Sequence, residues 1–123
     1  MKYIETKKAP AAIGPYSQAV VDENKLYCSG QIPVDPETGS VVEGGIETQA
    51  EQVMKNLAAV FEEAGTSYEK VIKTTCFLAD IKDFAAFNEV YAKFFTSKPA
   101  RSCVAVRDIP KGALCEIECI AEA

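Results

Sequence analysis

The stretch ALCEIECIA, residues 113–121, has the alternation of a β-strand with two different faces. Every second residue is small, apolar or a thiol, and these residues are Ala113, Cys115, Ile117, Cys119 and Ala121. The residues between them include Glu116 and Glu118. A shift of one residue in strand pairing would bury both glutamates, so the register is strongly specified. The stretch predicts a strand with one face against the core and a mixed face on the other side.

Two apolar stripes with helical spacing lie upstream of this strand and predict helices over residues 48–64 and 83–95. Thr48 and Glu51 have the spacing of a capping box at the start of the first helix. Gly65 follows the last residue of that stripe, where a glycine commonly ends a helix.

The remaining segments read as strands. Residues 18–30 have the pattern of a hairpin, and residues 69–80 contain a strand rich in β-branched side chains. The elements therefore run strands, helix, strand, helix and two strands. This order predicts an α+β fold in one domain over residues 1–123, with a single sheet and both helices packed on one face.

The stretch KPARSCVAV, residues 98–106, predicts the strand that precedes 113–121. Val104 and Val106 have the character of core residues. Arg101 and Cys103 alternate with them, so we expect these two side chains on the face away from the helices.

A four-residue turn at 108–111 would join these last two strands in an antiparallel hairpin. The resulting register pairs Arg101 with Glu118 and Cys103 with Glu116. Arg101 is then either half of a structural cross-strand ion pair or a partly desolvated receptor for an anion. A sheet face that is both apolar and charged also suggests burial against other subunits.

Composition excludes several kinds of site. The chain has no histidine, no GxGxxG and no P-loop, which removes Ser-His-Asp and Cys-His schemes, the usual zinc sites and nucleotide-cofactor fingerprints. We therefore expect neither a metal nor a cofactor. The net charge of −5 and the lack of a basic stripe argue against nucleic-acid binding.

The cysteines and the ends of the chain bear on location. The five cysteines are Cys28, Cys76, Cys103, Cys115 and Cys119. An odd number without C-x-x-C, in apolar stretches, is typical of reduced buried thiols. No apolar run could span a bilayer and no signal pattern begins the chain, so we expect a cytoplasmic protein with no membrane partner.

Five stretches together resemble the RidA family, the reactive intermediate deaminases also called YjgF-like proteins. They are APAAIGPYSQA, YCSGQIPVDPETG, DFAAFNEVYAKFF, PARSCVAV and IPKGALCEIECIA, in the family's order and spacing. The arginine of PARSCV is shared with the archetypal RidA subfamily. The resemblance implies a chorismate-mutase-like fold in a homotrimer, with a central barrel of sheets and sites between subunits.

The resemblance also implies an activity. It is the hydrolysis of 2-iminobutanoate, 2-iminopropanoate and their enamine tautomers, such as 2-aminoacrylate, to 2-oxoacids and ammonia, without a cofactor. Two alternatives remain open: a non-catalytic regulatory protein that binds small carboxylates, and an RNA-directed translation inhibitor or endoribonuclease. Ala105 and Arg107 depart from the residues expected in close relatives, which leaves the substrate preference open.

Carried over by motif, the resemblance implies that Arg101 clamps the substrate carboxylate and Glu116 activates the attacking water. The remaining implied substrate-binding residues are Tyr16, Gly30, Phe84, Asn88 and Cys103. Cys103 is expected to act through its backbone, because no base accompanies its thiol. Asn88 lies on the apolar stripe of the second helix, so its amide is either bonded to backbone at the edge of the core or directed at a ligand.

Overall fold

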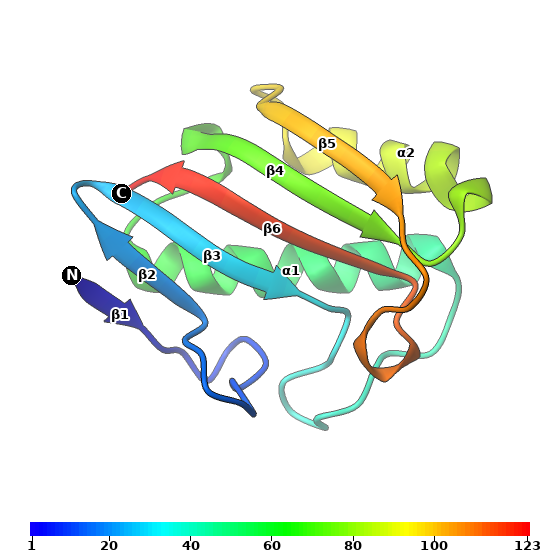
Figure 1. The fold of residues 1–123 in the computed structure, drawn as a ribbon, viewed down its shortest axis with the longest axis horizontal. Coiled ribbons are helices and arrows are strands. Elements are labelled where there is room, and N and C mark those ends of the chain that lie inside the picture. The colour runs from blue at the N-terminus through cyan, green and yellow to red at the C-terminus, as the bar shows by residue number, and fades with distance from the viewer.

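The apolar stripes of the two helices face one side of a six-stranded mixed sheet in the computed structural model, which describes all residues 1–123 (Figure 1). The strands are β1 (Lys2–Ile4), β2 (Ala19–Asp22), β3 (Lys25–Gln31), β4 (Val71–Leu78), β5 (Ala100–Ala105) and β6 (Cys115–Glu122). The helices are α1 (Ile46–Ala64) and α2 (Phe84–Phe94), with short 3₁₀ turns at Tyr68–Lys70, Ile81–Asp83 and Pro110–Gly112. The sheet order is β1-β2-β3-β6-β4-β5.

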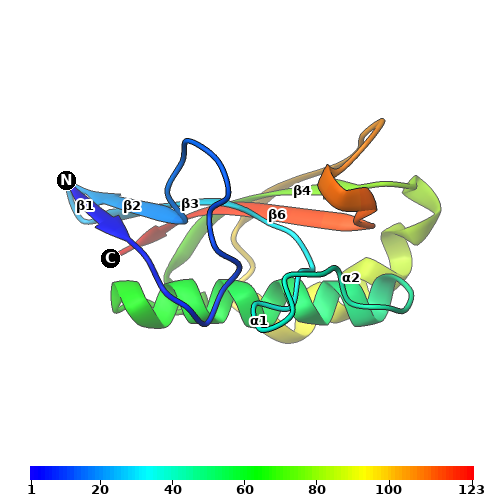
Figure 2. The ribbon, with the colours of Figure 1, turned by 90° about the horizontal axis from the view of Figure 1, so that it is seen from below.

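Both helices lie on one side of the sheet and leave the other side open, as Figure 2 shows. A cluster of 23 buried residues fills the space between the two layers. The five alternating residues from Ala113 to Ala121 are all buried, whereas Glu116 is half-buried and Glu118 is exposed. The two faces predicted for this strand are therefore confirmed, and the open face is the mixed one. Neither helix is long and apolar enough to cross a membrane.

The end of α1 was predicted correctly and its start was not. Gly65 adopts a left-handed conformation (φ 78°), and its N–H donates to the Glu62 carbonyl at 3.2 Å. The helix begins at Ile46 with Gly45 as its N-cap, so Thr48 lies inside the first turn and forms no capping box. The stripe starts at Ile46, which is buried, and its burial extends the helix beyond the local capping signal.

The predicted hairpin between β5 and β6 is wrong. β4 lies between these strands, paired parallel with β5 and antiparallel with β6 (Figure 1). The connection from β4 to β5 passes through α2, which is the kind of crossover that a parallel pair requires. The segment between β5 and β6 then carries the chain past β4. Consecutive strands usually pair, and here the helix crossover overrides that tendency.

This pairing reverses the predicted faces of β5. Arg101 is the Cα partner of Thr74, and Cys103 is the partner of Cys76. Both β4 residues are fully buried beneath the helices. Arg101 and Cys103 therefore point toward the helix side, while Val104 is 45% exposed rather than part of the core. The predicted pairs of Arg101 with Glu118 and of Cys103 with Glu116 do not form.

Candidate functional site

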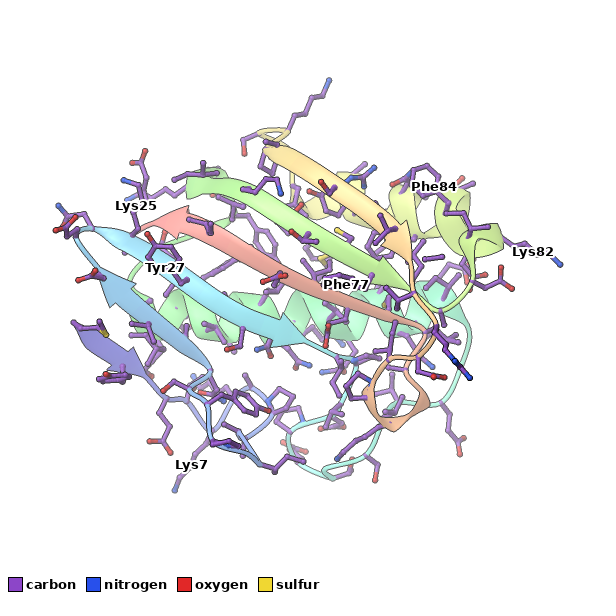
Figure 3. All side chains as sticks on the ribbon, in the orientation of Figure 1. Lys7, Lys25, Tyr27, Phe77, Lys82 and Phe84 are labelled. Carbon is purple, nitrogen blue, oxygen red and sulfur yellow. The ribbon has the colours of Figure 1, made fainter.

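Arg101 is held by α2 at the edge of the sheet. One guanidinium N–H donates to Asn88 Oδ1 at 2.7 Å, and the guanidinium carbon lies 4.7 Å from the ring centroid of Tyr91. Phe84, labelled in Figure 3, contributes a second ring at 5.7 Å. The only ion pairs in the chain are Lys8–Glu62 and Arg107–Asp108, so Arg101 has no carboxylate partner. Its planar fork keeps donors free for an anion.

Two hydroxyl groups fix the ring beneath Arg101. Tyr91 Oη lies 2.7 Å from Thr74 Oγ1, and Thr74 is fully buried on β4. Burial raises the pKa of the Tyr91 phenol, so the ring stays neutral at ordinary pH. The neutral ring offers its face to the guanidinium as a cation–π platform.

The Asn88 side chain makes no hydrogen bond to the backbone, which was the first of the two alternatives left open by the sequence. Its side-chain oxygen accepts from Arg101 rather than from the backbone. A cavity of about 450 Å³ opens beside this pair, and Tyr91, Pro99 and Lys98 are among its lining residues. Asn88 therefore orients the guanidinium at the wall of a space large enough for a small carboxylate.

Glu116 lies on the open face of β6 against Gly30 of β3. A Cβ atom built at Gly30 would lie 2.7 Å from Glu116 Cδ, so a larger residue there would displace the Glu116 carboxylate from this position. Burial raises the pKa of the Glu116 carboxyl group, and the negative charge of Glu118 raises it further. A carboxylate with a raised pKa is a better proton acceptor than an ordinary one near neutral pH.

A second cavity, of about 190 Å³, opens beside Gly30. Tyr16 lines it from the segment between β1 and β2, and Lys111 lines it from the turn before β6. Tyr16 is 54% exposed, so its ring is available at the mouth of this cavity. The segment that carries it rises beyond the open face of the sheet in Figure 2.

The predicted site residues thus form two separate groups. Arg101, Asn88, Phe84 and Cys103 gather at β5 and α2, whereas Glu116, Gly30 and Tyr16 gather on the other side of the sheet. β4 lies between the strands that carry Arg101 and Glu116. Within one chain, these two side chains cannot contact the same small molecule.

The Cys103 thiol is poorly placed for nucleophilic attack. It packs against the core next to its strand partner Cys76. Burial raises the pKa of Cys103, although the nearby positive charge of Arg101 opposes this shift. Burial also raises the pKa of Cys76 and of Cys115 to about 12. All five cysteines are free, and burial disfavours the thiolate form of Cys103.

Sequence reasoning missed the support beneath Arg101. The apolar stripe predicted over residues 83–95 includes Tyr91, and its ring is indeed part of the core. The stripe gives no sign that the Tyr91 hydroxyl group has a hydrogen-bond partner. Thr74 lies in the segment that was predicted as a strand from its β-branched residues. A buried hydroxyl needs a partner, and that requirement was the available signal for pairing these two residues.

Comparisons with known proteins support a single family. The model of the family described as Endoribonuclease L-PSP matches residues 6–123. A human protein named 2-iminobutanoate/2-iminopropanoate deaminase is 47% identical over 121 residues, covering 98% of this chain and 88% of that protein. The chain belongs to the RidA family. Another member, named putative regulator AldR, from Lactococcus lactis, is 55% identical and covers 99% of this chain and 98% of its own.

Solved RidA-family structures share the fold. A Yersinia pestis protein described as a member of the conserved Rid family, YyfA, has a TM-score of 0.96 at 52% identity, covering 99% of this chain and 98% of its own. Escherichia coli TdcF, solved with bound serine, has a TM-score of 0.94 at 44% identity, covering 100% and 99%. The α+β sheet with two helices is therefore the fold of this family.

Proposed function

We propose that the chain is a deaminase that hydrolyses 2-iminoacids and their enamine tautomers to 2-oxoacids and ammonia. The observation that carries this proposal is Arg101, a half-buried guanidinium that is oriented by Asn88 and Tyr91 and has no carboxylate of its own. The name of the human relative supports 2-iminobutanoate and 2-iminopropanoate as substrates. The serine bound to TdcF supports a site for small amino-acid-like carboxylates.

The proposed chemistry requires only positioning and proton transfer. Arg101 binds the substrate carboxylate through its fork and holds C2 in place. Glu116 takes a proton from water as the water oxygen attacks C2, and the imine nitrogen gains a proton. In the resulting carbinolamine, protonated Glu116 gives its proton to the amine nitrogen, and the hydroxyl group returns to solvent the proton that the imine nitrogen had taken up. The C–N bond then breaks to give the 2-oxoacid and ammonia. No metal or cofactor enters this scheme.

A site that uses both groups requires two chains, because Arg101 and Glu116 lie on opposite faces of the sheet. The open face also carries an apolar row across four strands, and this row is Tyr3, Val20, Tyr27 and Ile120. Tyr27, labelled in Figure 3, is 48% exposed. Covering this face in a homotrimer would bury the row and bring Arg101 of one chain to Glu116 of another.

Mixed trimers test this shared site. Arg101→Ala and Glu116→Gln chains, each inactive alone, are co-expressed with different tags, and the mixed trimers are isolated. A site is intact when its arginine comes from a Glu116→Gln chain and its glutamate comes from an Arg101→Ala chain. Every mixed trimer has three sites between chains, and only one of them combines an intact arginine with an intact glutamate. We expect semicarbazone trapping of 2-iminopropanoate by the isolated mixed trimers to show about a third of the unaltered activity.

Absence of recovery in mixed trimers would show that both groups act from the same chain, which contradicts the shared site. The shared site would also be contradicted if the ultracentrifuge showed a monomer at micromolar concentration and that monomer were fully active in the trapping assay. The matched control is co-expression of two differently tagged Arg101→Ala chains, which should stay inactive.

A regulatory role is the second candidate, because the Lactococcus relative is named a putative regulator. Such a protein would use Arg101 to bind a carboxylate without turnover. Tight binding of 2-oxoacids together with no acceleration of semicarbazone-trapped imine hydrolysis would favour it. The endoribonuclease name of the family model suggests an RNA substrate. The acidic chain and the lack of histidine make that the weaker alternative.

Glu118→Gln should move the acid limb of the kcat/KM profile to lower pH. Activity that needs the Glu116 carboxylate is lost as the pH falls through its raised pKa. The charge of Glu118 contributes to that rise, so its removal lowers the pKa and delays the loss. Thr75→Val, at the strand partner of Glu118, changes no charge and should leave the limb in place. If the pH at which kcat/KM falls on the acid side is unchanged or higher in Glu118→Gln, Glu116 is not the base.

A further inference from the structure

The cavity beside Gly30 is enclosed by two segments without regular secondary structure. Residues 10–18 form one wall and carry Tyr16, and residues 31–39 form the other. Gly30, the next-to-last residue of β3, lies between them and packs against Glu116. The wall that carries Tyr16 therefore bounds the space beside Gly30, the residue that packs against Glu116.

The wall of residues 31–39 is fixed at several points. Its backbone forms hydrogen bonds within the loop, from Asp35 N–H to the Ser40 carbonyl at 3.0 Å and from Gly39 N–H to the Asp35 carbonyl at 2.8 Å. The buried amide of Asn56 on α1 donates to the carbonyls of Ile32 and Val34, at 3.0 Å each. Because these hydrogen bonds are spread along the loop, the loss of any one of them would leave residues 31–39 held by the others.

The wall of residues 10–18 depends mainly on one side chain. Gln18 is 3% exposed, and its amide nitrogen donates to the carbonyls of Pro10 at 2.8 Å and Thr6 at 3.0 Å. Its amide oxygen accepts from the N–H of Thr6 at 2.7 Å. The backbone of Gln18 is tied to β3, because its carbonyl accepts from Ser29 N–H at 2.9 Å.

Few other bonds hold this segment. Tyr16 N–H donates to the Gly14 carbonyl at 2.8 Å, which shapes the local turn but does not anchor it to the sheet. Ser29 Oγ donates to the Ser17 carbonyl at 2.6 Å, close to the point where β2 begins. Between residues 6 and 10, the Gln18 amide makes the hydrogen bonds that are shielded from solvent, and the exposed Lys8–Glu62 pair at 3.3 Å is the other polar contact with the rest of the protein.

We infer that Gln18 is a positioning residue, whose buried amide clamps the start of the 10–18 wall and so holds Tyr16 in place at the mouth of the cavity beside Gly30. Gln18 affects the reaction by positioning residues 10–18, and it does not contact the substrate itself. The inference rests on the proposed deaminase function for its kinetic consequence. Its structural consequence, the placement of residue 16, does not depend on that function.

The chain contains no tryptophan, so Tyr16→Trp supplies a single indole reporter at the mouth of the cavity. In that background, Gln18→Met removes the donors and the acceptor while keeping the length of the side chain. We expect the indole emission to shift, its anisotropy to fall and its quenching by acrylamide to increase. Gln49→Met is the matched control, because Gln49 is a buried glutamine that holds Leu114 N–H and not this wall.

Kinetics with the native Tyr16 provide the second readout. Gln18→Met should raise KM for 2-iminopropanoate about tenfold and leave kcat within about twofold, because a displaced wall weakens binding in the ground state and the transition state alike. Val60→Ala, a core change in α1 away from the cavity, should lower the melting temperature without changing KM. Gln18→Glu keeps the shape and the acceptor, so it serves if Gln18→Met fails to fold.

An unchanged indole signal and an unchanged KM in a folded Gln18 variant would overturn the inference and leave Gln18 a purely structural residue. A mobile indole with no imine hydrolysis by the unaltered protein would retain the clamp and reject the deaminase function. The two failures are therefore distinguishable.

Discussion

Glu116→Gln is expected to reduce the catalysed hydrolysis of 2-iminopropanoate by about 10²- to 10⁴-fold, the usual contribution of a positioned acid–base group. The amide keeps the shape of the side chain that packs against Gly30. It cannot accept the proton of the attacking water. Burial raises the pKa of Glu116, so removing this charge should not lower the melting temperature at neutral pH.

The measurement follows semicarbazone formation from imine generated in situ, with the uncatalysed rate subtracted. Calorimetry with 2-oxobutanoate checks that the variant still binds a product-like carboxylate, because Arg101 is unchanged. Glu118→Gln is the control on the same strand face and should retain most of the activity near neutral pH. If Glu116→Gln stays nearly as active as the unaltered protein, another group must activate the water, and Glu118 is then the next candidate.

Arg101→Lys is expected to lower kcat/KM at least about tenfold, which corresponds to about 1.4 kcal/mol of transition-state stabilisation. Lysine keeps the positive charge but replaces a planar fork by a single ammonium group. It cannot donate to Asn88 Oδ1 at 2.7 Å and also bind a carboxylate through two parallel hydrogen bonds. Stacking on Tyr91 is lost as well. The affinity for 2-oxoacids should fall together with turnover.

Arg107→Lys is the matched control for this change. Arg107 is exposed and pairs only with its neighbour Asp108 at 3.8 Å, so the substitution should leave kinetics and stability unaltered. Analytical ultracentrifugation verifies the same assembly in all variants. The carboxylate clamp is rejected if Arg101→Lys lowers the melting temperature while imine hydrolysis per folded protein stays constant.

The sequence predicted the central strand better than the edge strand. β6 is buried on one face along its length, so its alternation states which residues meet the core. β5 is an edge strand with no fully buried residue, and neither of its two alternating sets is uniformly apolar. The residues from Arg101 to Val104 give no local signal that decides which of the two alternating sets faces the helices. That choice follows from the crossover through α2, a non-local feature.

The site was predicted as a set of residues and not as an arrangement. The family motifs named Arg101, Glu116 and Asn88, and the structure gives Asn88 a direct contact with Arg101. The predicted hairpin placed Arg101 and Glu116 on one face, which is wrong because pairing with β4 turns Arg101 toward the helices while Glu116 lies on the open face. The supporting groups, Tyr91 and Gln18, escaped notice because hydrogen bonds between distant segments leave no periodic signal in a sequence.

The position of β4 between Arg101 and Glu116 bears on how activity would respond to the amount of protein. A lone chain could hold a carboxylate or activate a water molecule, but it could not do both to one substrate. If the two groups meet only across chains, the rate per chain falls on dilution while every chain remains folded. Protein abundance would then switch the chemistry on and off without any effector molecule.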